Sequence, residues 1–198
     1  MKRFFTILVI CAIFSFRAQA QEYVDLGLSV NWAAYNIGAE SLDDPGKLYL
    51  VGTNIEHIQG VKYQKSQVPN FSGDYSGNPQ LDMATQTWGS EWRTPTLAEW
   101  LELINKCSWK YYKYIDANGK ERKGYEITGP NGNKIILPSN YWARNNGCGL
   151  YQCSTSFASS ARGNLYSFLF SPQKRTIYFL PPYNFTSLGV SYRPVSNK

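Results

Sequence analysis

Histidine is almost absent from this sequence and cysteine is sparse: the 198 residues include one histidine, His57, and four cysteines. A Ser-His-Asp or Cys-His catalytic site would have to use His57. That residue stands in a segment rich in glycine and glutamine, without a nucleophile elbow, so we expect it at the surface. A zinc site is not expected either, because no Cys-x-x-Cys pair accompanies the single histidine. Glycine patterns that bind phosphates or dinucleotides are also missing, and we expect neither a cofactor nor a metal.

Long apolar runs are confined to the first twenty residues. Lys2 and Arg3 form a positive start, residues 4–16 are apolar, and Ala18-Gln19-Ala20 is typical of a cleavage site. The run is too short for a stop-transfer helix. We therefore expect a signal peptide over residues 1–20 and a single domain over residues 21–198, with no membrane span after cleavage. The expected location is the periplasm, the cell surface or the medium. Cys11 follows Ile10, where a lipoprotein has a small residue, so no lipid anchor is expected.

A strong positive charge is lacking once the signal peptide is set aside. The formal charge of +6 includes three basic residues of the first twenty, so 20 − 3 = 17 basic residues remain against 14 acidic ones, or +3. The remaining basic residues are scattered, apart from a cluster at Lys120, Arg122 and Lys123. Such a short cluster is typical of a solvated loop, and we expect no nucleic-acid partner.

Three cysteines follow the expected signal peptide, so at most one internal disulfide can form. Cys148 and Cys153 are nearest in sequence, and a bridge between them would close a small loop in an oxidising compartment. Pairing of Cys107 with either of them stays open. Cys107 itself follows a predicted helix and is expected to be a buried thiol.

Two helix starts stand close together in the middle of the chain. Asp82 is placed to cap a short helix over residues 83–88, which Gly89 would end. Thr96 and Glu99 have the spacing of a capping box, in which each side chain accepts the other residue's backbone N–H. The apolar residues of the second helix then form one stripe: Leu97, Trp100, Leu101 and Ile104.

Alternating apolar residues and turn signals predict an antiparallel remainder. The Asn118-Gly119 pair and the sequence 129–132 predict two hairpin turns, and hence a three-strand meander. The expected strands cover residues 24–30, 48–51, 109–115, 124–128, 134–137, 165–170, 175–180 and 188–195. Residues 41–80 and 139–162 are expected to be long loops. The fold class is therefore α+β, with an early strand, two helices, then antiparallel strands to the C-terminus, and long loops.

Four segments, in this order, carry a resemblance to a known family. Residues 24–33, VDLGLSVNWA, look like an opening VDLGLSVKWA, and WGSEWRTPT from residue 88, with Glu99-Trp100, is similar to WGGxWRxPTxxEW. Residues 124–138, GYEITGPNGNKIILP, resemble the hairpin GYxxTGPNGNxIxLP, and residues 191–195, SYRPV, resemble a closing SVRPV. On these motifs the chain resembles the Fibrobacter succinogenes major paralogous domain family, which is common in secreted proteins of Bacteroidetes.

The resemblance implies a C-type-lectin-like fold related to the formylglycine-generating-enzyme group. In that fold the two termini pair in one sheet, two helices flank the sheet, and a long irregular region supplies the ligand face. The implied role is a non-enzymatic extracellular module suspected of adhesion or glycan binding. The chain departs from the family pattern at Tyr35, where a cysteine is common, and at Gln152 and Cys153, where the family has YWSST.

Carboxylates could support two further kinds of chemistry. Calcium-dependent sugar binding needs several oxygen ligands in one cage, and the nearest motif, Asn78-Pro79-Gln80, lacks a carboxylate. A glycosidase needs two paired carboxylates. Glu99 is assigned to the capping box, and Glu91, Glu102 and Glu126 have no evident partner carboxylate. We expect no enzyme activity.

Aromatic and amide side chains remain as the candidate binding groups, in a chain with 15 tyrosines and six tryptophans. Tyr and Trp faces stack on sugars and protein surfaces, while Asn, Gln and Arg supply fixed donors. The predicted ligand-binding residues of the loop 139–162 are Trp142, Arg144, Asn145, Asn146, Tyr151 and Gln152. We expect a binding or adhesion module for a glycan or a host or bacterial surface protein. The alternatives are a structural subunit or tip component of a surface fibre and, less favoured, an uncharacterised hydrolase.

Overall fold

A computed structural model describes residues 21–67, 72–140, 147–157, 164–180 and 189–198. This part of the chain forms three three-stranded sheets, one two-stranded sheet and two α-helices. Every pair of these strands is antiparallel, and a parallel pairing occurs in the isolated bridge between Tyr151 and Ser191. The predicted α+β class is confirmed. Within the described ranges no helix is long and apolar enough to cross a membrane.

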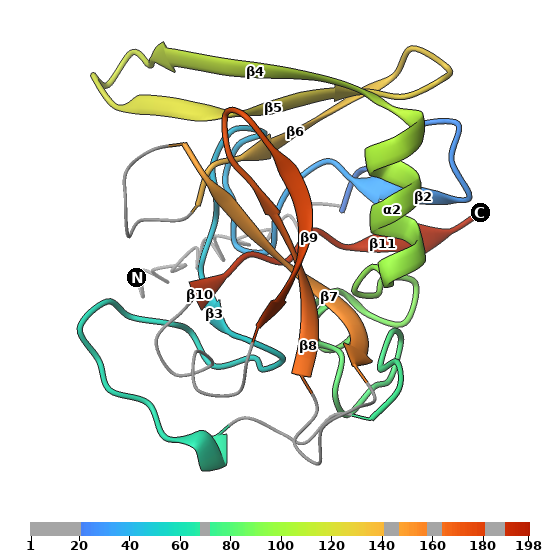
Figure 1. Cartoon of the computed structure of the whole chain (residues 1–198), viewed down its shortest axis with the longest axis vertical. Coiled ribbons are helices and arrows are strands. Elements are labelled where there is room, and N and C mark those ends of the chain that lie inside the picture. Colours follow the sequence, from blue (N-terminus) through green and yellow to red (C-terminus); the bar gives the residue numbers. More distant parts are fainter. Residues whose placement is uncertain (1–20, 68–71, 141–146, 158–163, 181–188) are drawn as a thin grey trace, which may run out of the picture.

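The two ends of the described chain meet in one sheet (Figure 1). Strands β1 (Tyr23–Asp25), β2 (Val30–Ala33) and β11 (Val195–Asn197) pair in the order β1-β2-β11. The prediction of one continuous strand over residues 24–30 is wrong. Gly27 has a φ of 75°, which favours glycine, and turns the chain so that Val24 pairs with Trp32.

The segment 188–195 was also predicted as one strand and is two. Strand β10 (Gly189–Val190) pairs with β3 (Tyr49–Leu50), and β11 then pairs with β2. Pro194 separates them and has no N–H to donate to a ladder. The prediction of a short strand over residues 48–51 is confirmed by β3.

The predicted meander is confirmed and lies across one end of the molecule (Figure 1). It consists of β4 (Ser108–Ile115), β5 (Glu121–Thr128) and β6 (Lys134–Pro138). Successive side chains of a strand point to opposite faces. Trp109 and Tyr111 of β4 pack on the core, as do their cross-strand partners Ile127 and Tyr125. The alternate residues of β4 and β5 form what we call the outer face of the meander.

A third sheet contains one strand that was not predicted. Strand β7 (Gly149–Phe157) pairs with β8 (Asn164–Phe170), which pairs with β9 (Arg175–Leu180). β8 and β9 match the predicted strands, whereas β7 lies in the segment predicted as a loop. Residues 149–154 are all buried, so both faces of this part of the strand are covered, and the next residue, Thr155, is partly exposed. The alternation of polar and apolar residues that marks a half-buried strand is therefore missing.

Both helices begin as predicted. Asp82 accepts the N–H of Ala84 and caps α1 (Met83–Trp88), which ends at Gly89. Helix α2 (Leu97–Lys106) begins with the complete Thr96–Glu99 capping box. The predicted apolar stripe needs one correction. Leu103 is fully buried, whereas Leu101 is 41 % exposed, so Leu103 takes the place assigned to Leu101. A 3-10 helix, η1 (Lys65–Gln67), is the remaining helical segment of the described chain.

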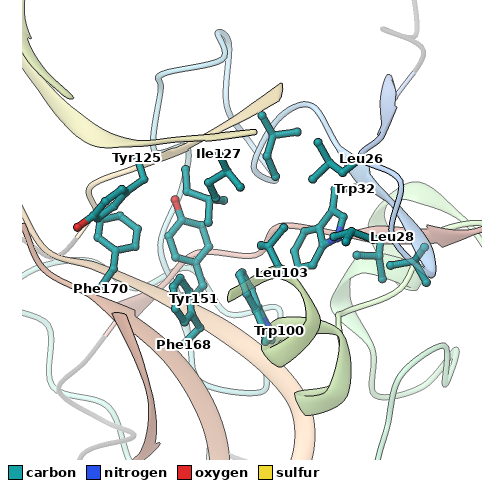
Figure 2. Packing of buried hydrophobic residues seen from close by; sticks show 14 of the residues in the cluster. Leu26, Leu28, Trp32, Trp100, Leu103, Tyr125, Ile127, Tyr151, Phe168 and Phe170 are labelled. Atoms are coloured by element: carbon teal, nitrogen blue, oxygen red, sulfur yellow. The ribbon is translucent and has the colours of Figure 1, made fainter. Parts of the chain in front are cut away.

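The main core joins α2, the meander and the strands β2, β7 and β8 (Figure 2). Trp100 of α2 is fully buried at its centre. Its ring lies 4.9 Å from that of Trp32, edge to face, and 4.7 Å from that of Phe168, stacked. Such aromatic pairs add stabilisation beyond the area they bury. This core fixes β7, and with it one end of the loop predicted to bind.

Candidate functional site

The loop predicted to bind ligand has a rigid base. Asn140 accepts the Leu150 N–H on Oδ1 at 2.6 Å and donates from Nδ2 to the Leu150 carbonyl at 2.9 Å. Ser139 donates from Oγ to the Cys148 carbonyl at 2.6 Å, and the Asn140 N–H donates to the same carbonyl at 3.2 Å. Four hydrogen bonds therefore close the stem between β6 and β7. Trp142, Arg144, Asn145 and Asn146 lie outside the described residues.

The stem is also attached to the meander. The Ser139 N–H donates to the Lys123 carbonyl of β5 at 2.7 Å. The Asn140 side chain is buried, so its two bonds to Leu150 are shielded from water. The positions of residues 139–140 and 148–150 are thus set by β5, β6 and β7 together.

Tyr151 is part of the core rather than of a binding face (Figure 2). Its side chain is fully buried, with its ring 5.9 Å from Trp100 and 6.0 Å from Phe170. The hydroxyl donates to the Pro138 carbonyl at 2.6 Å and accepts from Asn36 Nδ2 at 3.3 Å. Burial raises the pKa of Tyr151 to about 12, so the phenol stays protonated. The prediction that Tyr151 contacts a ligand is wrong, because a surface ligand cannot reach it.

Gln152 was likewise predicted to bind ligand and is fully buried. Its Oε1 accepts the Gly52 N–H at 3.1 Å, and its Nε2 donates to the Cys153 carbonyl at 2.5 Å. The side chain thereby attaches the loop after β3 to β7. The ligand-binding role predicted for Gln152 is wrong for the same reason as for Tyr151.

A buried arginine sits next to these two residues and was not singled out from the sequence as a site. Arg193 is fully buried and donates from Nε to Asn36 Oδ1 at 2.7 Å. Its Nη1 donates to the carbonyls of Ala33 and Ala34 at 2.9 and 2.6 Å, and its Nη2 donates to the Ile136 carbonyl at 2.6 Å. Burial lowers the pKa of Arg193 to about 10, and the guanidinium stays charged at neutral pH. This group joins the C-terminal segment, the end of β2 and the edge of β6.

The predicted bridge between Cys148 and Cys153 is not formed, and no disulfide is present among the described cysteines. Both residues lie on one extended segment that enters and continues β7. At about 3.3 Å per residue their Cα atoms are roughly 16 Å apart, whereas a disulfide needs less than about 7 Å. Burial raises the pKa of the Cys153 thiol to about 12 and that of Cys107 to about 11, so neither is a ready nucleophile.

His57 is buried, and its predicted place at the surface is wrong. Its side chain is 8 % exposed and stacks on Tyr63 with ring centroids 5.4 Å apart. Nδ1 is buried without a hydrogen-bond partner, and Gly189 packs against this part of the ring. Burial lowers the pKa of His57. Among the residues that the structure describes, no nucleophilic side chain forms a hydrogen bond with His57.

Three of the four glutamates that a glycosidase could use, Glu99, Glu102 and Glu126, have structural partners. Glu99 completes the capping box and forms an ion pair with Arg93, with two N–O contacts of 2.5 and 3.0 Å. Glu102 accepts from Ser29 and Lys106. Glu126 accepts from Lys134 at 2.9 Å across the meander. In the ranges that the structure describes, no three histidine, cysteine or acidic residues are grouped closely enough to hold a metal ion.

No family model, curated protein or solved structure matches this chain.

Proposed function

We propose that the protein is a secreted, non-enzymatic binding module whose loop between β6 and β7 binds a glycan or a surface protein. The observation that carries the proposal is the closed stem of that loop, in which Ser139 and Asn140 make four hydrogen bonds to Cys148 and Leu150. A preorganised stem lowers the entropy cost of presenting binding side chains. The loop itself contributes Trp142, Arg144, Asn145 and Asn146.

We further propose a C-type-lectin-like fold and membership of the Fibrobacter succinogenes major paralogous domain family. The four sequence motifs support this assignment. The sheet β1-β2-β11, which joins the two ends of the described chain, is the arrangement that the resemblance implies.

A screen of residues 21–198 on immobilised glycans, followed by titration of any glycan bound, tests the function. Trp142→Ala and Arg144→Ala are expected to weaken binding by about 1–2 kcal/mol each, because aromatic and arginine anchors carry much of the energy of interfaces. The melting temperature of both variants should match the parent. A chelator is expected to leave binding unchanged.

Tyr151→Ala is the matched control, since Tyr151 follows the same loop but lies in the core. It should lower the melting temperature by removing a buried aromatic ring. Binding that is unaffected by Trp142→Ala and Arg144→Ala, or that is abolished by a chelator, would overturn the proposal.

A further inference from the structure

The outer face of the meander presents an exposed aromatic ring beside the stem of the binding loop. Tyr114 of β4 is 46 % exposed and lies directly opposite Arg122 of β5. The ring of Tyr112, two residues earlier on the same face, is 5.9 Å away. Arg122 is followed by Lys123, whose carbonyl accepts the Ser139 N–H of the stem. Tyr114 therefore lies along one edge of β5 at residues 122–123, and the stem lies along the other edge.

The surroundings of this ring are polar. The Tyr114 hydroxyl donates to Asp43, and Asp43 also accepts from Ser41 Oγ at 2.8 Å. On the opposite strand Arg122 donates from Nε to Asp116 at 2.8 Å. Leu42, next to Asp43, is 46 % exposed. We call these residues the Tyr114 platform: Leu42, Asp43, Tyr112, Tyr114, Asp116 and Arg122.

Hydrogen bonding in the platform is incomplete. The Tyr112 hydroxyl and Arg122 Nη1 are shielded from water and have no partner. A buried donor without a partner costs free energy. The Arg122 side chain as a whole is 17 % exposed, so part of the guanidinium side chain reaches the surface next to its unpaired donor. An apolar partner would leave that donor unpaired, whereas a hydroxyl group would accept from it and could also donate to Asp43.

Charge narrows the choice of ligand further. The carboxylates of Asp43, Asp44 and Asp116 lie around the single guanidinium of Arg122. An acidic saccharide or a phosphate would be repelled by these carboxylates. A neutral sugar meets each requirement, since it has an apolar C–H face for the Tyr114 ring and hydroxyl groups for Arg122 and Asp43.

We propose that the Tyr114 platform is a binding site for a neutral saccharide, in which one sugar ring stacks on Tyr114 and its hydroxyl groups bond to Asp43 and Arg122. This inference rests on the proposed binding function and names its ligand class. It does not use the residues of the loop between β6 and β7. Ile115, which is 62 % exposed and points away from the platform on the opposite face of β4, lies outside the site.

The test uses titration calorimetry of residues 21–198 with four neutral probes, namely gluco-, xylo-, manno- and malto-oligosaccharides, and with acidic oligogalacturonate. At least one neutral probe should bind and the acidic probe should not. Tyr114→Ala should raise the Kd of that neutral probe about tenfold or more, as loss of a stacking anchor does. Tyr114→Phe keeps the ring and should stay much nearer to the parent.

Ile115→Ala is the matched control, because it removes an exposed apolar side chain from the same strand without touching the platform, and it should leave the Kd unchanged. Melting temperatures of all three variants verify folding. Amide chemical shifts give a second readout that needs no variant: the neutral probe should perturb residues 112–114 and 122 of the parent.

The outcomes separate this inference from the proposed function. Binding of a neutral probe that Trp142→Ala weakens and Tyr114→Ala does not would overturn the platform and keep the loop. Absence of binding by all neutral probes would overturn the saccharide assignment and leave a protein ligand for the loop. Equal binding of oligogalacturonate would overturn the restriction of the platform to neutral saccharides. Binding that neither variant changes would overturn both.

Discussion

Individual polar residues in this protein are difficult to place from the sequence alone. Tyr151, Gln152 and Arg193 are of types that occur on binding surfaces, yet all three are fully buried. Each is satisfied by backbone groups that belong to segments far away in the chain, such as Gly52 for Gln152 and Ala33 for Arg193. A sequence does not show these long-range partners. The predicted binding face therefore included two core residues, and the buried arginine was missed.

Burial of His57 makes the free energy of unfolding depend on pH. Burial lowers its pKa in the folded protein, whereas in the unfolded chain it titrates near 6.5. Between these two pKa values the unfolded chain binds more protons than the folded protein, so the free energy of unfolding decreases as the pH falls below about 6.5. Above that pH, His57 is neutral in both states and its contribution to the free energy of unfolding is fully present. The slope contributed by this one group is at most about 1.4 kcal/mol per pH unit.

His57→Phe keeps a ring on Tyr63 and removes the titration. Urea unfolding of the parent and the variant from pH 7.5 to 5 should show a steeper loss of stability in the parent. Parallel pH profiles of the two proteins over this range would show that His57 is not held neutral by burial.

Secondary structure elements were predicted well where the signal is local. The capping box of α2, the cap of α1 and the hairpin turn at Asn118-Gly119 each depend on residues within a few positions of one another. Strand β7 was not predicted, and the pairs β1-β2 and β10-β11 were each predicted as one strand. β7 is buried on both faces and lacks alternation, and Gly27 and Pro194 interrupt runs whose apolar pattern continues across them.

The register of α2 gives a prediction with its own matched pair. Leu103 is fully buried in the core and Leu101 is 41 % exposed, although both stand on the same helix two residues apart. Leu103→Ala should cost about 2–5 kcal/mol of unfolding free energy, since it leaves a cavity against the core. Leu101→Ala should change it by less than about 0.5 kcal/mol.

Denaturant unfolding of the two variants measures both values. Because both changes are Leu→Ala, a difference in lost stability reflects the position on the helix and not the type of side chain. Equal losses would mean that the apolar face of α2 is the stripe through Leu101 that the sequence pattern suggested.

At the scale of the whole molecule, the C-terminal segment closes the fold on two sides. Val195 is fully buried and pairs with Trp32 of β2. On its other side it exchanges two backbone hydrogen bonds with Arg93, each 2.9 Å long, just before α2. The preceding Arg193 bonds to the end of β2 and to β6. Three chain segments distant in sequence, namely β2 with its end, the residues just before α2, and β6, thus depend on residues 193–195.

Removal of residues 195–198 should therefore destabilise the sheet that joins the two chain ends, and not merely fray a terminus. We expect a fall in melting temperature well beyond that of a chain lacking only Lys198, whose ion pair with Asp25 is largely exposed and contributes little. Hydrogen exchange distinguishes local from global loss, because amides of β2 and those near Arg93 should lose protection together, while the hairpin β4-β5 keeps most of its own. If β2 stays protected in the shortened chain, the sheet is held by β1 and the core alone, and closure by the C-terminal strand is not what stabilises it.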